Sequence, residues 1–133
     1  MIFIDTGAFV ARYRSSDAHH TAAKAGWAKI TRDGPPCFTT DLVIAETITL
    51  LARYIGYRPA AERGRVFLSS AALTILRPTL EDETAALDLL EKFADQEVSF
   101  VDCVSFVMMK NRRVRRVFGF DRHFTAAGFS QWK

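Results

Sequence analysis

The chain has 133 residues, of which 49% are hydrophobic and 25% are charged, and its formal net charge is +3. This length predicts one domain, residues 1–133, that buries most of its apolar surface on folding. No apolar run is long enough to span a membrane, and Met1 leads into an apolar stretch without a basic leader, so a cytoplasmic location is expected.

Short apolar runs alternate with longer amphipathic ones, which predicts strands joined by crossover helices in a parallel sheet. The first strand is expected at residues 1–5. A helix capped by Ser16 or Asp17 follows, and the Gly-Pro-Pro sequence of residues 34–36 ends it. The second strand is expected at residues 37–39.

The middle of the chain predicts two successive helices. The first begins at Thr40 or Asp41 and runs to about Tyr54. Pro59 suits the first turn of the second helix, which extends to Phe67, because proline is tolerated where the amide hydrogen has no helical partner.

A third strand is expected at residues 72–76, followed by a capping box at residues 79–82. The helix that begins there carries one apolar stripe and is expected to pack on the sheet through Leu80, Leu87, Leu90 and Ala94. A helix at residues 100–112 is apolar on several sides and therefore enclosed. Strands at residues 117–120 and, at the sheet edge, 128–132 complete an α/β fold.

Acidic residues stand where ligands gather in such a sheet, which is outside the carboxyl ends of the strands. Asp5 ends the first strand and Asp121 ends the fourth, so their carboxylates face each other if these strands are neighbours. Glu46 lies one turn into the helix after the second strand and shares an apolar face with Val43 and Leu50. Carboxylates in apolar surroundings need a counter-charge, and hard oxygen ligands suit Mg²⁺ or Mn²⁺.

The aspartates also have simpler structural interpretations. Residues 99–102 form a second capping box, with Asp102 at the third helical position. Asp5 can cap a helix that begins near Thr6, and Asp121 can be a turn residue. The glutamate on the apolar helix face has no such alternative, and the placement of all four acids at one edge favours a shared metal site.

Cysteine and histidine provide no further metal site in this sequence. Cys37 and Cys103 fit neither a disulfide framework nor a zinc-ligand spacing, so free core thiols are expected. His19, His20 and His123 are interpreted as surface or packing residues, because metal-bound water needs no imidazole to activate it.

Positive charge is concentrated late in the chain. Residues 110–123 contain six basic side chains and a single acid. The candidates for binding an RNA backbone are Lys110, Arg112, Arg113, Arg115 and Arg116. The alternative is a solvated helix end whose arginines complement the helix dipole.

Four ordered segments together resemble the motifs of PIN-domain ribonucleases, and among these the VapC-type toxins. They span nearly the whole chain and are FIDTGAFVA (3–11), TTDLVIAETITLL (39–51), SFVDCVSF (99–106) and FGFDRHF (118–124). The resemblance implies a three-layer α/β/α sandwich with a central parallel sheet of four to five strands. It also implies an Mg²⁺-dependent (or Mn²⁺-dependent) endoribonuclease, a VapB-type antitoxin partner and a homodimer.

The same resemblance assigns roles to individual residues. It implies that the catalytic, metal-binding carboxylates are Asp5, Glu46, Asp102 and Asp121, and that Thr6 and Ser105 support them. The chain departs from the family at Gly119, where many relatives have threonine, and this puts a water or phosphate contact in doubt. For the two supporting residues, helix capping and core filling are the simpler alternatives.

Other classes of protein remain as alternatives. The leading one is a catalytically silent PIN-fold module that binds RNA or protein, although an intact acidic quartet argues against it because clustered carboxylates without metal repel one another. A receiver-type phosphoacceptor domain needs an aspartate at the end of the third strand, where Arg77 follows instead. A haloacid-dehalogenase-type phosphatase needs a second aspartate where Gly7 stands.

Overall fold

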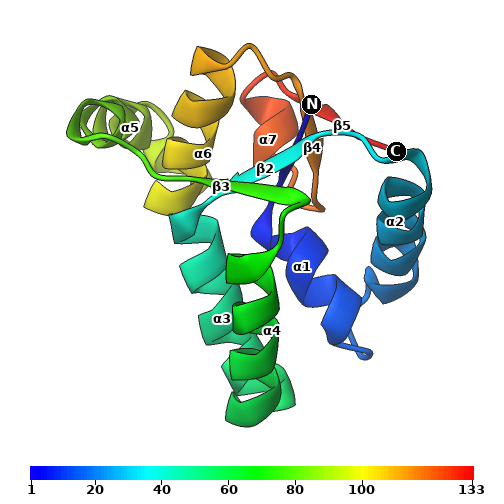
Figure 1. The fold of residues 1–133 in the computed structure, drawn as a ribbon. Helices are drawn as coiled ribbons and strands as arrows, with labels where there is room; N and C mark the ends of the chain where they lie inside the picture. Colours follow the sequence, from blue (N-terminus) through cyan, green and yellow to red (C-terminus); the bar gives the residue numbers. More distant parts are fainter.

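The computed structural model describes residues 1–133 and contains one five-stranded parallel sheet in the order β3-β2-β1-β4-β5 (Figure 1). The strands are β1 (Ile2–Ile4), β2 (Cys37–Thr40), β3 (Leu73–Leu76), β4 (Arg116–Phe118) and β5 (Ser130–Gln131). The helices are α1 (Thr6–Tyr13), α2 (His20–Asp33), α3 (Asp41–Ile55), α4 (Tyr57–Ser69), α5 (Leu80–Lys92), α6 (Phe100–Asn111) and α7 (His123–Ala126), with the short 3-10 helix η1 (Ala94–Gln96). The predicted α/β fold with crossover helices is therefore confirmed.

The sheet reverses its strand order at β1. The chain runs from β1 outward through β2 to β3, and later returns to the other side of β1 with β4 and then β5. Ile4 pairs with Phe118, and the amide of Asp5 donates to the carbonyl of Phe118 over 3.0 Å. The adjacency of the first and fourth strands, on which the predicted acidic crevice depends, is confirmed.

Local hydrogen bonds explain several of the element boundaries. The Thr40 hydroxyl accepts from the amide of Val43 over 3.1 Å and starts α3. Thr79 and Asp82 form the predicted capping box of α5. Gly34 ends α2 in the left-handed region at φ 62°, a conformation that costs glycine little.

The predicted cap of α2 is wrong. This helix begins at His20 with His19 at the N-cap position, later than a cap at Ser16 or Asp17 would place it. The carboxylate of Asp17 accepts from the amide of His19 over 2.8 Å. Asp17 thus closes a local turn before the helix rather than capping its first turn.

The predicted apolar stripe of α5 is also wrong. Leu80 is 82% exposed and Leu87 is 50% exposed, whereas Ala86 is the buried residue of the helix. The helix packs on α6, not on the sheet. It is held there by a narrow contact around Ala86 and the partly buried Leu90. Ala94 is exposed and lies beyond the helix, in η1.

The helix α6 is enclosed as predicted, with residues 102–109 all buried. Its Phe106 ring meets the ring of Phe124 edge to face at a centroid distance of 4.9 Å, and Phe124 stacks on Phe3 of β1. The two cysteines are free and buried, as expected. None of the helices combines the length and apolar character that a membrane-spanning segment requires.

Candidate metal centre at the carboxyl edge of the sheet

Asp5 is the most deeply buried acid and follows β1 directly, with a relative exposure of 4%. It occupies the N-cap position of α1, yet its side chain makes no capping hydrogen bond. The capping interpretation of Asp5 is therefore wrong. A buried carboxylate without this partner needs compensation from elsewhere.

The surroundings of Asp5 disfavour its charged form. Burial raises the pKa of Asp5 well above its usual value, and the negative charge of Asp102 raises it further. A hydrogen bond from the backbone of Thr6 lowers this pKa, whereas the charges of Asp121 and Glu46 raise it. All four predicted acids therefore contribute to one electrostatic site.

Asp102 combines a capping role with membership of this site. Its amide donates to the Ser99 hydroxyl over 3.1 Å, and its carboxylate accepts from the Ser99 amide over 3.4 Å. Burial raises the pKa of Asp102, the charge of Asp121 adds to the rise, and the hydrogen bonds from Ser99 oppose it. The capping box is confirmed, and it orients a carboxylate that faces other acids.

Asp121 lies in the turn between β4 and α7. Its Oδ1 atom accepts from the amide of His123 over 2.8 Å and lies 2.9 Å from the Nδ1 atom of the same histidine. One ligand atom from each of Asp102, Asp121 and His123 lies within 4.8 Å of the other two. His123 thus adjoins the acids, which the sequence interpretation missed. The available signal was its position two residues after Asp121, the spacing at which an aspartate closes a turn onto the following backbone.

Glu46 approaches the site from α3, where it is partly buried between the buried residues Ile44 and Thr47. Its charge raises the pKa of both Asp5 and Asp102. The glutamate therefore contributes to the site from a fourth part of the fold, as its helical position predicted.

The two predicted supporting hydroxyls differ in their surroundings. Thr6 Oγ1 is buried and has no hydrogen-bond partner within the protein, directly beside Asp5. Ser105 Oγ donates to the carbonyl of Val101 over 3.0 Å, which satisfies it within α6. Thr6 therefore has a hydroxyl free for a water or ligand, and Ser105 matches the simpler core-filling interpretation.

This donor set suits a hard divalent cation. Carboxylate oxygens are the ligands that Mg²⁺ and Mn²⁺ prefer. A bound cation would favour the ionised form of Asp5 and Asp102, which their surroundings otherwise disfavour. The unpartnered hydroxyl of Thr6 provides a further polar contact for a coordinated water.

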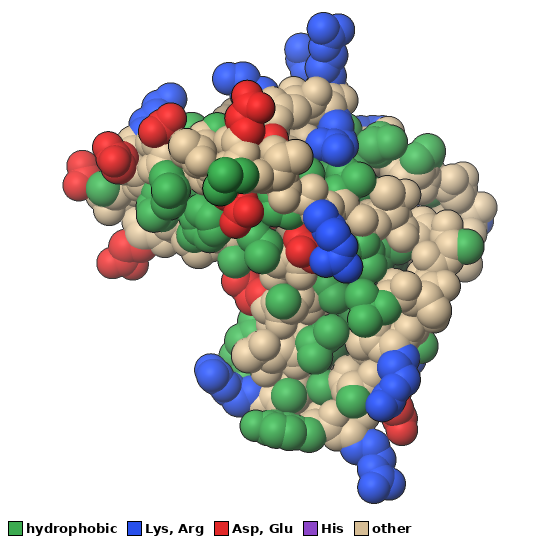
Figure 2. Space-filling view, turned by 60° about the vertical axis from the view of Figure 1, so that its left-hand side comes forward, with side chains coloured by type: hydrophobic (Ala, Val, Ile, Leu, Met, Phe, Trp, Pro, Cys, Tyr) green, Lys and Arg blue, Asp and Glu red, His purple; other side chains and the backbone are tan.

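The basic candidates are not brought together with the acids. They are exposed and lie at the end of α6 and the start of β4, namely Lys110, Arg112, Arg113, Arg115 and Arg116. The start of β4 is the amino edge of the parallel sheet, whereas the acids follow the carboxyl ends of its strands. Lys and Arg side chains accordingly gather at the top of Figure 2, the end at which the loop between α6 and β4 lies in Figure 1.

Comparisons with known proteins agree with this geometry. The family model of the PIN domain matches residues 2–130. The chain is 36% identical over 129 residues to the 23S rRNA-specific endonuclease VapC20 of Mycobacterium tuberculosis strains CDC 1551 / Oshkosh and H37Rv, covering 97% of this chain and 95% of that protein. The crystal structure of Mycobacterium tuberculosis VapC20, a sarcin-ricin loop cleaving toxin, superposes with a TM-score of 0.89 at 34% identity, over 98% of this chain and 97% of that one. The chain belongs to the PIN-domain family, in which it resembles the VapC-type toxins.

Proposed function

We propose that this protein is an Mg²⁺-dependent endoribonuclease and the toxin of a VapBC-type toxin–antitoxin pair. The observation that carries the proposal is that the charges of three further carboxylates act on Asp5, which is buried and makes no capping bond. Such an arrangement is costly without a cation and useful with one. The match to PIN domains over almost the whole chain supports the same activity.

The residues that would hold the ion are the predicted quartet, directly or through water: Asp5, Glu46, Asp102 and Asp121. A bound divalent ion would supply a water of lowered pKa and would neutralise charge on a phosphodiester. Ser99 fixes the orientation of Asp102, and His123 holds Asp121 through its backbone amide. Thr6 would orient a water through its unpartnered hydroxyl.

The proposed substrate is a structured RNA, with a loop of 23S ribosomal RNA as the first candidate, because the relative VapC20 is named for that RNA. Cytoplasmic action follows from this substrate. We retain Lys110, Arg112, Arg113, Arg115 and Arg116 as proposed backbone contacts. Because these residues lie at the amino edge of the sheet, they would contact only RNA backbone that extends well beyond the cleaved phosphodiester bond.

Two exposed apolar surfaces support the proposed protein partners. The hairpin of α3 and α4 projects away from the sheet (Figure 1) and exposes Tyr54, Tyr57, Val66 and Leu68, with Tyr57 exposed by 82%. Within α4, Tyr57 and Leu68 lie on the same side of the helix and Val66 on the opposite side. We propose that a VapB-type antitoxin covers the side that carries Tyr57 and Leu68. This contact is supported if Tyr57→Lys or Leu68→Glu no longer co-purifies with the antitoxin while keeping wild-type thermal stability.

We propose that the exposed side chains of Leu80 and Leu87 on α5 form the contact of a homodimer. A shift from dimer to monomer in Leu80→Lys would support this contact.

The decisive experiment is cleavage of purified 23S ribosomal RNA followed by mapping of the new ends. Cleavage is expected with Mg²⁺, and its loss is expected with chelator or in Asp5→Asn. Asp88→Asn is the matched control, since it removes an exposed carboxylate of α5 and should cleave normally. If wild type with Mg²⁺, wild type with chelator and the Asp5→Asn variant all cleave equally, the assignment as a metal-dependent ribonuclease is refuted. RNA binding without any new ends would favour the catalytically silent module instead.

A further inference from the structure

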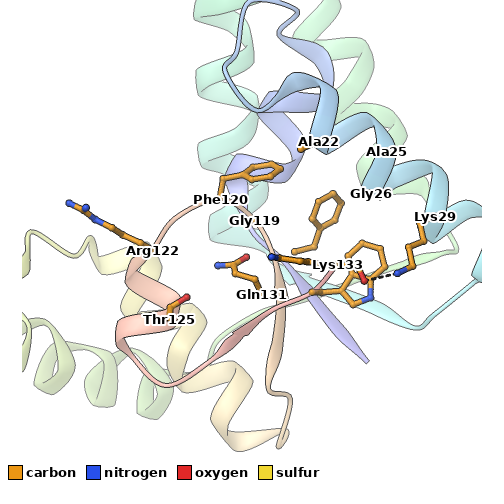
Figure 3. A pocket seen from close by; sticks show the side chains of 12 residues that line it. Ala22, Ala25, Gly26, Lys29, Gly119, Phe120, Arg122, Thr125, Gln131 and Lys133 are labelled. Carbon is orange, nitrogen blue, oxygen red and sulfur yellow. Dashed lines mark hydrogen bonds between the residues drawn. The ribbon is translucent and has the colours of Figure 1, made fainter.

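A concave site lies near the acids, between α2 and the strands β4 and β5 (Figure 3). The cavity has a volume of about 580 Å³. We propose that it binds an unstacked RNA base next to the phosphate that is cleaved, and we call it the base pocket. This inference rests on the proposed ribonuclease function and extends it to how the substrate is positioned.

The base pocket has an aromatic lining. The rings of Phe118 and Trp132 lie 5.2 Å apart between centroids at an interplanar angle of 58°, and both residues are largely buried. The partly buried ring of Phe120 lies 6.2 Å from that of Phe118 at 74° and is stacked on one face by the His19 imidazole, 4.4 Å away. Small residues of α2 also line the pocket, and Gly26 lets this helix pack directly on Phe118, since a Cβ atom there would lie 2.5 Å from the ring. An apolar pocket lined by aromatic rings suits an RNA base, because proteins hold splayed bases against aromatic side chains.

Charge at the rim complements a nucleic acid. The pocket is lined by Lys29, Arg122 and Lys133, and no acidic side chain lines it. The ammonium of Lys29 lies 5.2 Å from the ring centroid of Trp132 and donates to the main-chain oxygen of Lys133. Arg122 extends outward from the rim in Figure 3, where an RNA backbone would pass. These cations would attract the phosphates that flank a bound base.

Polar groups at the mouth provide a means of reading the base. Gln131 and Thr125 both line the pocket, and an amide or hydroxyl can hydrogen-bond a base edge. The Gln131 side-chain nitrogen lies 3.5 Å from the main-chain oxygen of Asp121, a weak bond that a base could replace. The same side chain thus contacts both the pocket and the backbone of a predicted metal ligand.

The pocket and the acids share one stretch of backbone. Gly119 and Phe120 line the pocket and lead directly into Asp121. Gly119 also lies against Asp5, because a Cβ atom added to this glycine would lie only 2.9 Å from the Cβ atom of Asp5. A base in the pocket would therefore lie beside the nucleotide whose phosphate reaches the carboxylates, which identifies the pocket as a subsite for substrate selection.

The kinetic test compares Lys29→Glu and Gln131→Ala with Lys24→Glu. Lys24 is exposed on the same helix but does not line the pocket, so this control repeats the charge reversal. With a hairpin that contains the mapped cut site, we expect about a tenfold higher KM for Lys29→Glu, and less discrimination among flanking bases for Gln131→Ala. If the wild type cleaves the hairpin and both pocket variants behave like Lys24→Glu, the base-pocket proposal is refuted. The ribonuclease assignment would still hold in that case.

A binding test needs no catalysis. Trp132 lies in the pocket, so the same hairpin added to the Asp5→Asn protein should change tryptophan emission. The emission change should disappear in the double variant Asp5→Asn, Trp132→Phe. Fluorescence anisotropy of labelled hairpin RNA should show that this double variant still binds the RNA. An emission change that persists without Trp132, or saturating RNA binding without any change, would overturn the proposal. If the wild type fails to cleave, this test still decides whether the pocket holds RNA.

Discussion

A Cβ atom added to Gly119 would lie 2.9 Å from the Cβ atom of Asp5 and 3.4 Å from its Oδ2 atom. Real Cβ atoms essentially never approach so closely, so any larger residue at position 119 must displace Asp5 or the backbone after β4. The departure from the threonine of many relatives is therefore coupled to the position of the buried carboxylate. The observed geometry of the site therefore has room for glycine at position 119 and for no larger residue.

Restoring the family threonine should impair this enzyme. Gly119→Thr is expected to lower the free energy of unfolding by about 1–3 kcal/mol through overpacking, and to lower kcat by displacing Asp5. The control is Gly7→Ala, whose added Cβ would meet Phe120 at an ordinary 3.6 Å. Thermal unfolding and cleavage of the mapped RNA measure both effects. An increase in kcat for Gly119→Thr would contradict the packing argument.

Asp5→Asn should stabilise the metal-free protein while abolishing cleavage. The substitution removes a buried negative charge that faces three other acids, and we expect a gain on the order of 1 kcal/mol in chelator. In wild type, Mg²⁺ at about 100 times its Kd should add about 2.7 kcal/mol, and most of this gain should vanish in Asp5→Asn. Differential scanning calorimetry with and without Mg²⁺ measures both, with Asp88→Asn as the neutral comparison. A variant less stable than wild type in chelator would count against the charge argument.

The stability of the metal-free protein should fall as the pH rises above about 4. Burial and neighbouring charges raise the folded-state pKa of Asp5 and Asp102, so the folded state binds more protons than the unfolded state in this window. This contribution is fully present below the unfolded pKa and is lost as the pH rises through the folded pKa. Denaturant titrations in chelator should show a smaller pH dependence for Asp5→Asn than for wild type. If the free energy of unfolding depends on pH in the same way in wild type and in Asp5→Asn, the assignment of the raised pKa to Asp5 is refuted.

His123→Ala should weaken the metal centre without unfolding the protein. Its ring lies 2.9 Å from a carboxylate oxygen of Asp121, and groups that orient metal ligands typically contribute about 10–100-fold to metal affinity or activity. The expected result is a higher Mn²⁺ or Mg²⁺ concentration at half-maximal cleavage. His20→Ala is the comparison, because His20 Nδ1 contacts the main-chain oxygen of Ala11 over 2.7 Å, outside the acidic site. The same loss in both variants would indicate general destabilisation rather than a role at the metal.

Features that depend on near neighbours in the chain were predictable. The capping boxes at Thr79 and Ser99 and the glycine that ends α2 follow from hydrogen bonds and dihedral angles within a few residues. The alternation of apolar runs and helical periods likewise predicted the five strands and the helices α2 to α6 in order, whereas α7 was not predicted. Asp5 at the end of its strand and Glu46 on an apolar helix face were visible for the same reason, because both depend on local periodicity.

Features that depend on contacts between distant segments were decided by the tertiary structure. Leu80 and Leu87 of α5 are exposed because α6 separates that helix from the sheet, and Gly119 is confined because β4 pairs with β1 beside Asp5. The direction of α6 and β4 likewise places the arginine-rich loop at the opposite edge from the acids. By itself the sequence determined the capping boxes of α5 and α6 and which aspartates stand at element ends, since both are short-range properties. Only the tertiary structure decided that His123 adjoins those acids and that an aromatic pocket lies beside them, because these depend on how the chain packs in three dimensions.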